Sequence, residues 1–208
     1  MSPAARFEAL LCCGLVCAFL ALGPSSAYAA ADPAREAKAS AVVAHARELA
    51  VAIERGKLSR EAERKQWNEL RGLIDSQSIS QFVLGPKWND ATPPQKRGFA
   101  TTVSDLVVQR LVDRLGNPQA EPFELGQTRT LDDGDVVVVS RVKFRDGHTG
   151  ELDWRLHPTG DKVAVSDVLV DGASVAVGAR DEAANELTAN GGSIAKLIAS
   201  MRNRLRFQ

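Results

Sequence analysis

Hydrophobic residues recur along the chain with two different spacings, and the change between them divides the sequence into three regions. Over 33–116 and again over 174–206, apolar residues return every three or four positions, the period of helices that bury one face. The sharpest boundary is Thr92-Pro93-Pro94-Gln95, which matches a capping box with proline at the first helical position. This boundary predicts a helix that begins after Thr92 and ends near Gly116.

Over 121–171 the apolar spacing shortens to two, the period of strands with one buried face. Turn-forming clusters interrupt this region at Asp132-Asp133-Gly134, Asp146-Gly147-His148 and Pro158-Thr159-Gly160. They separate four strand-like runs, which predict a twisted antiparallel four-stranded meander. Helices, a meander and then helices indicate an α+β fold in which helices cover one face of the sheet.

The middle hairpin of this meander has a preferred register. A three-residue loop at 146–148 would sort its side chains into one apolar face and one face of paired charges. This register pairs Val142 with Leu152, Ser140 with Trp154, Val138 with Leu156, Lys143 with Glu151, and Arg141 with Asp153. The last run, 163–170, has apolar residues at both parities, so the pattern assigns it no inner face.

The first 29 residues have the layout of a secretory signal peptide. Arg6 is followed by an apolar run from Ala9 to Gly23, and Ala27-Tyr28-Ala29 matches the pattern that signal peptidase cleaves. The alternative is an uncleaved membrane anchor, but the run is shorter than the ~20 residues that a spanning helix needs. We therefore expect cleavage after Ala29 and a mature domain of residues 30–208. In a Gram-negative cell this domain would be periplasmic.

Composition removes several classes of function. The chain has 26 Lys and Arg against 26 Asp and Glu, so it has no net charge with which to attract nucleic acid. The three cysteines, Cys12, Cys13 and Cys17, all lie within the predicted signal peptide. The mature domain is therefore expected to have no disulfide, no thiol nucleophile and no thiolate metal site.

The remaining polar residues form no recognisable catalytic or metal motif. His45, His148 and His157 are far apart in the sequence and make no His-x-x-x-His pair. We therefore expect no metal, no cofactor and no catalytic residue. Two alternatives remain open. One is an exported enzyme whose pocket brings Asp167 together with Arg155 or His157, and the other is a structural or adaptor protein with a filled core.

Three stretches resemble the MlaC/toluene-tolerance family of periplasmic phospholipid-binding proteins. The first is Ile79–Phe99, with a Leu-Gly pair, an aromatic residue and the Ala-Thr-Pro-x-Gln that precedes the long helix. The second is Val165–Arg180, and the third is the Gly-x-x-x-Leu-Ile pattern of Gly192–Ile198. The chain departs from the family at Ala179, where an aromatic is usual, and at Ala183 or Ala184, where phenylalanine is common. A related branch, the HpnM type, is associated with hopanoid biosynthesis.

The resemblance implies both a fold and a function. The fold would be nuclear-transport-factor-2-like (NTF2-like), with an apolar cavity between sheet and helices. The function would be that of a periplasmic carrier that moves phospholipid between an outer-membrane lipoprotein complex and an inner-membrane ABC transporter complex. The alternatives are a hopanoid-associated carrier of another two-chain or polycyclic lipid, and an exported NTF2-like enzyme.

Candidate cavity residues combine this resemblance with the apolar faces that the pattern predicts. They are Phe82, Trp88, Phe99, Val103, Val107, Leu111, Val142, Trp154, Val168 and Leu197.

Overall fold

The computed structural model describes residues 32–116, 123–143 and 147–206, so the predicted signal peptide, residues 1–29, lies outside it. The helices are α1 Pro33–Glu54, α2 Arg60–Gly72, α3 Ser76–Leu84, α4 Lys87–Asp90, α5 Pro93–Leu115, α6 Val175–Ala189 and α7 Ile194–Arg202. The strands are β1 Glu124–Thr130, β2 Val136–Lys143, β3 Thr149–Thr159, β4 Lys162–Val170 and β5 Ala173–Ser174.

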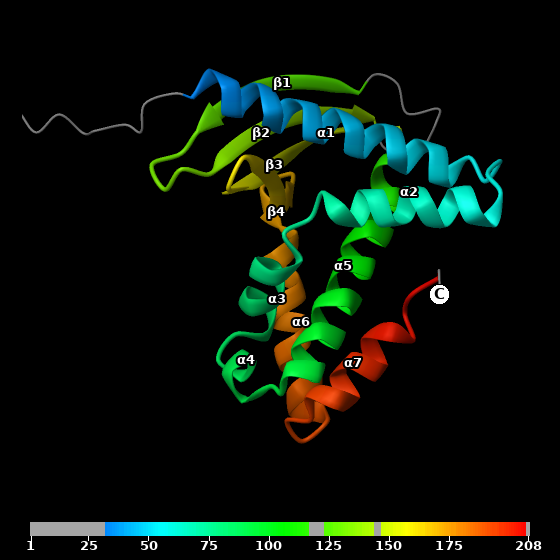
Figure 1. Ribbon diagram of the computed structural model, residues 1–208, viewed down its shortest axis with the longest axis vertical. Coiled ribbons are helices and arrows are strands. Elements are labelled where there is room, and N and C mark those ends of the chain that lie inside the picture. The colour runs from blue at the N-terminus through cyan, green and yellow to red at the C-terminus, as the bar shows by residue number, and fades with distance from the viewer. Residues whose placement is uncertain (1–31, 117–122, 144–146, 207–208) are drawn as a thin grey trace, which may run out of the picture.

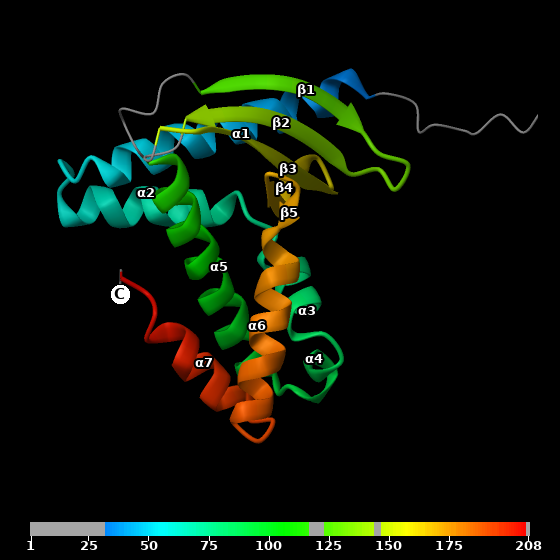
Figure 2. The same cartoon turned by 180° about the vertical axis from the view of Figure 1, so that it is seen from behind.

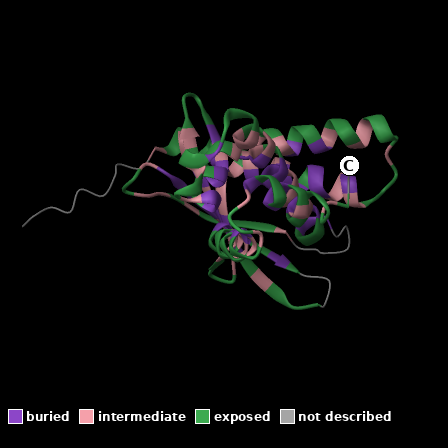
Figure 3. Ribbon diagram, turned by 90° about the horizontal axis from the view of Figure 1, so that it is seen from below, coloured by how far each residue is buried: buried purple, intermediate pink, exposed green. Residues whose placement is uncertain are grey.

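Two groups of helices pack against the sheet in different directions (Figures 1 and 2). Helix α1 lies across one face of the sheet with α2 beside it, whereas α3, α5, α6 and α7 form a bundle that extends away from the sheet on the side of β4. Figure 3 shows the buried residues where these helices meet one another and the sheet. Val43 of α1, Val138 of β2 and Trp154 of β3 are all fully buried there.

The described strands form one antiparallel sheet in the order β1-β2-β3-β4-β5. The predicted α+β fold and its meander are confirmed, with one strand more than the four predicted. The added strand, β5, has two residues and pairs Ala173 with Val170 and Ser174 with Leu169. It is too short to produce a periodic signal in the sequence, and it leads directly into α6.

The register of the β2–β3 hairpin differs from the prediction by two residues. Trp154 lies opposite Val138 rather than Ser140, and Glu151 lies opposite Arg141 rather than Lys143. The last pair is Lys143 with Thr149, so five residues separate the strands instead of three. The inner face is nevertheless the predicted one, because a shift of two keeps every side chain on its own side of the sheet.

Strand β4 contains a bulge that explains its mixed apolar pattern. Leu156 pairs with Val165 and Arg155 pairs with Asp167, which leaves Ser166 as an extra residue in β4. An extra residue reverses the alternation of the strand beyond it. Val165 on one side of the bulge and Val168 on the other are therefore both buried, although they have opposite parity.

Helix α5 begins with the predicted capping box. The Thr92 amide donates to Gln95 Oε1 at 2.8 Å, and the Gln95 amide donates to Thr92 Oγ1 at 3.4 Å. The helix ends at Leu115, and Gly116 follows with a φ of −68°, which any residue can adopt. Gly116 is required for space instead, because a Cβ there would lie 2.6 Å from Glu54 Cβ and 2.9 Å from the Ala50 carbonyl oxygen of α1.

Replacing Gly116 with alanine is expected to lower the free energy of unfolding by about 1–3 kcal/mol, because a methyl group would push α5 away from the backbone of α1. Urea unfolding followed by circular dichroism measures this change. Gly72→Ala is the matched control, since nothing lies within 4 Å of a Cβ at Gly72 and the helix gains about 0.5 kcal/mol from lost chain entropy. Equal effects of the two variants would contradict the close contact between α1 and α5.

Candidate functional site

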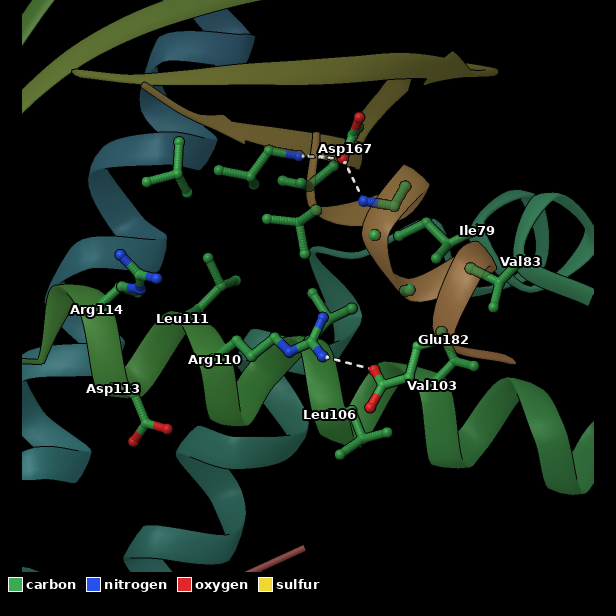
Figure 4. A pocket seen from close by; sticks show the side chains of 18 of the residues that line it. Ile79, Val83, Val103, Leu106, Arg110, Leu111, Asp113, Arg114, Asp167 and Glu182 are labelled. Atoms are coloured by element: carbon green, nitrogen blue, oxygen red, sulfur yellow. Dashed lines mark hydrogen bonds and ion pairs between the residues drawn. The ribbon is translucent and has the colours of Figure 1, made fainter. Parts of the chain in front are cut away.

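A cavity of about 580 Å³ lies between the helical bundle and strands β3 and β4 (Figure 4). Three sets of mainly aliphatic side chains form most of its walls, and Ile79 and Val83 of α3 add to them. Helix α5 contributes Val103, Leu106, Val107, Leu111 and Leu115. Helix α6 contributes Val175, Ala176, Ala179 and Ala183. The sheet contributes Leu152, Val165, Val168 and Val170. The volume falls within the roughly 300–1,000 Å³ of pockets that hold small organic ligands.

Helix α5 lies along one side of the cavity because its apolar residues recur at helical spacing. Val103, Val107 and Leu111 are four residues apart and therefore lie on one face, with Leu106 beside them. Val103 and Leu111 are buried, whereas Leu106 and Val107 are only half-buried. The exposed part of these side chains shows that the face of α5 is not fully covered by other protein atoms.

Helix α6 faces α5 with small side chains. Ala176, Ala179 and Ala183 follow one another at intervals of three and four residues, so they lie on the same face of the helix. Ala179 is one position at which the chain departs from the family pattern, and Ala183 is another candidate. Because alanine stands at both, the two helices leave space between them that a larger side chain would fill.

The bulge in β4 brings one carboxylate to the wall of the cavity. Asp167 Oδ1 accepts hydrogen bonds from the amides of Val168 at 2.8 Å and Ala176 at 3.0 Å. Its Oδ2 accepts from the Ser174 hydroxyl at 2.5 Å. Ser174 in turn caps α6 by accepting from the Val177 amide. Both oxygens of Asp167 are therefore engaged in fixing the start of α6.

The other two polar residues of the enzyme hypothesis lie away from the cavity. Arg155 Nε donates to Asp135 Oδ2 at 2.5 Å, and its guanidinium also pairs with Asp133. His157 Nδ1 lies 2.7 Å from Asp135 Oδ1. The hydrogen bond that Arg155 donates to Asp135 raises the pKa of Arg155 above its ordinary value, against the opposing effect of burial. Arg155 and His157 thus bind Asp135, and they do not converge with Asp167 in the cavity.

Charged residues border the cavity at the opening between α5 and α6. Arg110 Nη2 lies 3.4 Å from Glu182 Oε2, and this pair spans the gap between the two helices (Figure 4). Arg204, which follows α7, pairs with Glu182 and also with Glu186 Oε1 at 2.6 Å. Arg110, Glu182 and Arg204 all line the cavity. We call Arg110, Glu182, Glu186 and Arg204 the mouth cluster.

The ten candidate residues fall into two groups. Val103, Val107, Leu111 and Val168 line the cavity. The other six do not. Four of them are fully buried in the packed core: Phe99, Val142, Trp154 and Leu197. Trp154 donates from Nε1 to Ser140 Oγ at 2.9 Å, which fixes its ring within the sheet.

The remaining two candidates are aromatic residues on or near the surface. Phe82 is 40% exposed and lies under the Arg180 guanidinium, 5.1 Å from its ring centroid. Trp88 packs against the edge of the core with Lys96 5.4 Å from its ring centroid. The structure places them in cation–π contacts instead.

Sequence reasoning missed the contribution of α6 and the whole mouth cluster. The alanine spacing of α6 was a usable signal, because small residues at one helical face leave room beside a neighbouring helix. The mouth cluster had no such signal, since Arg110, Glu182 and Arg204 come from three separate segments. In the described residues no group of three or more His, Cys, Asp and Glu side chains is arranged to hold a metal ion. No helix in that part of the chain is long and apolar enough to span a membrane.

Comparison with known proteins shows which solved structure and which protein family this architecture resembles. A solved structure of a phospholipid-binding protein from Ralstonia solanacearum, in complex with a phospholipid, has a TM-score of 0.65 and 21% sequence identity to the chain. The match covers 82% of this chain and 96% of that one, so the two share a fold. A search of curated proteins found no match. The family model described as MlaC protein matches residues 46–203, which is most of the sequence. The chain belongs to the MlaC family.

Proposed function

We propose that the protein is a lipid carrier that encloses acyl chains in the cavity between α5, α6 and the sheet. The observation that carries this proposal is an unfilled space of about 580 Å³ whose walls are mainly aliphatic. A matching fold in a phospholipid-binding protein, solved with a phospholipid, supports the same assignment. The charged mouth cluster at the opening suits a ligand with an apolar body and a polar end.

The physical advantage of such a carrier follows from the hydrophobic effect. Moving one methylene group out of water is worth about 0.8 kcal/mol, so a chain of about fifteen methylenes is held in a membrane by roughly 12 kcal/mol. A lipid with two such chains therefore almost never crosses water unaided. An apolar cavity replaces most of the contacts that the chains lose on leaving the bilayer. No bond has to be broken for this, and we propose a carrier without enzymatic activity.

The route of the carrier belongs to the same proposal. We infer that the mature domain works in the periplasm after cleavage of residues 1–29, and that it carries phospholipid between an outer-membrane lipoprotein complex and an inner-membrane ABC transporter complex. The signal-like segment at the start of the sequence and membership of the MlaC family support this route. A formal net charge of zero suits a protein that must release from membranes as readily as it docks.

Filling the cavity is expected to expel the lipid. Ala179→Phe places a ring where the inner face of α6 meets the cavity, so the protein purified without detergent should contain severalfold less lipid than the wild type. Mass spectrometry of organic extracts, scaled to protein concentration, measures the amount. Ala184→Phe is the matched control, because Ala184 is exposed on the same helix and does not line the cavity.

The two variants separate binding from folding. Circular dichroism and a thermal unfolding curve should show that Ala179→Phe retains its fold. A folded Ala179→Phe protein with the wild-type lipid content would contradict binding in this cavity. A wild-type protein that contains no lipid and takes none up from vesicles would remove the proposed function altogether.

Export provides an independent prediction. When the full chain is expressed in a Gram-negative host, the periplasmic fraction should contain a protein whose intact mass matches a chain beginning at Ala30. Cleavage is expected there because Ala27 and Ala29 fit the small pockets of signal peptidase. Replacing Ala29 with lysine should leave the precursor uncleaved, whereas Ala21→Val should have no effect on cleavage. Recovery of the full-length chain from the cytosol would contradict the proposed location.

A further inference from the structure

The mouth cluster contains one carboxylate that two arginines share. One carboxylate oxygen of Glu182 in α6 forms an ion pair with Arg110 of α5. The other forms an ion pair with Arg204, in the segment after α7. All three residues line the cavity. Their side chains are 45%, 42% and 37% exposed for Arg110, Glu182 and Arg204. The cluster is therefore at the boundary between the apolar interior and solvent.

In ion pairs between exposed side chains, such as these, one anion can readily be replaced by another. Pairs between exposed side chains contribute little to stability, because water and salt screen both charges. The Arg110–Glu182 contact is also long, at 3.4 Å, and it uses a single nitrogen. Another anion could therefore displace the Glu182 carboxylate from Arg110 at little cost.

The Arg204 side chain is held in position independently of Glu182. Its second nitrogen, Nη2, lies 2.6 Å from Glu186 Oε1, one helical turn further along α6. The Arg204 carbonyl accepts a hydrogen bond from Gln109 of α5 at 3.2 Å, and the Arg206 amide donates to the same Gln109 side chain at 2.7 Å. The backbone and one side of the guanidinium thus remain fixed if Glu182 turns away, which lowers the entropy lost on binding a new anion.

We propose, resting on the lipid-carrier function above, that Arg110 and Arg204 bind the phosphodiester of the cargo lipid. In the empty protein the Glu182 carboxylate takes the place of that phosphate. A lipid with its chains in the cavity would have its polar end at this opening. Guanidinium groups bind phosphate through parallel N–H donors, in the same geometry as a carboxylate. Exchange of Glu182 for phosphate makes the site selective for lipids with an anionic phosphate over uncharged lipids with the same chains.

Competition between two lipids with identical chains, of which only one has a phosphate-containing headgroup, tests this selectivity. Lipid-free protein is incubated with vesicles of phosphatidylcholine that contain equal amounts of phosphatidylglycerol and diacylglycerol with identical chains. The protein is then separated from the vesicles, and its lipids are measured by mass spectrometry. Wild-type protein should be enriched in phosphatidylglycerol over diacylglycerol relative to the vesicles.

Removing the two charges should abolish the preference and leave the cavity intact. The double variant Arg110→Gln with Arg204→Gln is expected to lose roughly tenfold in the ratio of phosphatidylglycerol to diacylglycerol, the effect of a lost charge-assisted contact. Arg110→Gln alone should lose part of it, and this variant serves if the double variant does not fold. Arg97→Gln is the matched control, because Arg97 is exposed on α5 and does not line the cavity.

Glu182→Gln distinguishes exchange from simple attraction. This substitution removes the carboxylate that competes with the phosphate for the two arginines. The ratio of phosphatidylglycerol to diacylglycerol bound should therefore rise above that of the wild type. A fall in the ratio at unchanged total lipid would overturn the exchange. A wild-type protein that takes up both lipids in the vesicle ratio would overturn the phosphate site, and it would leave the carrier function standing. No uptake of any lipid would instead defeat the carrier function on which this inference rests.

A soluble phosphate ester has the same chemistry as the headgroup, and a separate titration distinguishes the two sources. Glycerol phosphate is titrated into lipid-free protein in a calorimeter. We expect no binding heat that depends on Arg110. Without acyl chains in the cavity, the contacts of the phosphate with two exposed arginines provide too little binding free energy. Arginine-dependent binding of glycerol phosphate that also blocks lipid uptake would overturn the proposal in favour of a soluble ligand.

Discussion

The Asp167 carboxylate joins the sheet to α6, and the cavity depends on that junction. Its two oxygens accept from the Val168 amide in β4, the Ala176 amide in α6 and the Ser174 hydroxyl between them. These bonds fix where α6 begins and the direction in which it leaves the sheet. Because α6 starts at the sheet and ends beside α7, it forms a wall facing α5 along the whole bundle (Figure 2). A carboxylate at a cavity wall is here a structural group.

The hollow is bounded on its sides by well-packed protein. Phe99 on α5, Trp154 on β3 and Leu197 on α7 are fully buried, so the elements that carry the cavity are anchored by their other faces. The surfaces between α5, α6 and the sheet leave a cavity, where alanines face aliphatic side chains. An unfilled apolar space reduces stability because its lining lacks contacts. A lipid chain would restore those contacts, so ligand binding and stability are coupled in this fold.

Most charged side chains near the cavity lie at its opening rather than in its interior. The mouth cluster places its arginines and carboxylates at the opening, where they are partly exposed, while the cavity lining is mainly aliphatic. A second polar group, Arg155 with Asp135 and His157, lies apart from the cavity. This division suits the proposed lipid ligand, with its chains inside and its polar end at the mouth.

The sequence alone determined the local elements, and the tertiary structure decided the site. The capping box of Thr92 and Gln95 fixed the start of α5, because that signal is contained within four residues. The alternation of β2 and β3 fixed which side chains face inward, but a shift of two residues keeps the same faces, so the pattern alone left the register open. The bulge at Ser166 reversed the alternation of β4, so its apolar residues could not be assigned to an inner face from the sequence. An apolar stripe looks the same whether it meets a packed core or a hollow, which is why Val103, Val107, Leu111 and Val168 line the cavity while Phe99 and Trp154 do not.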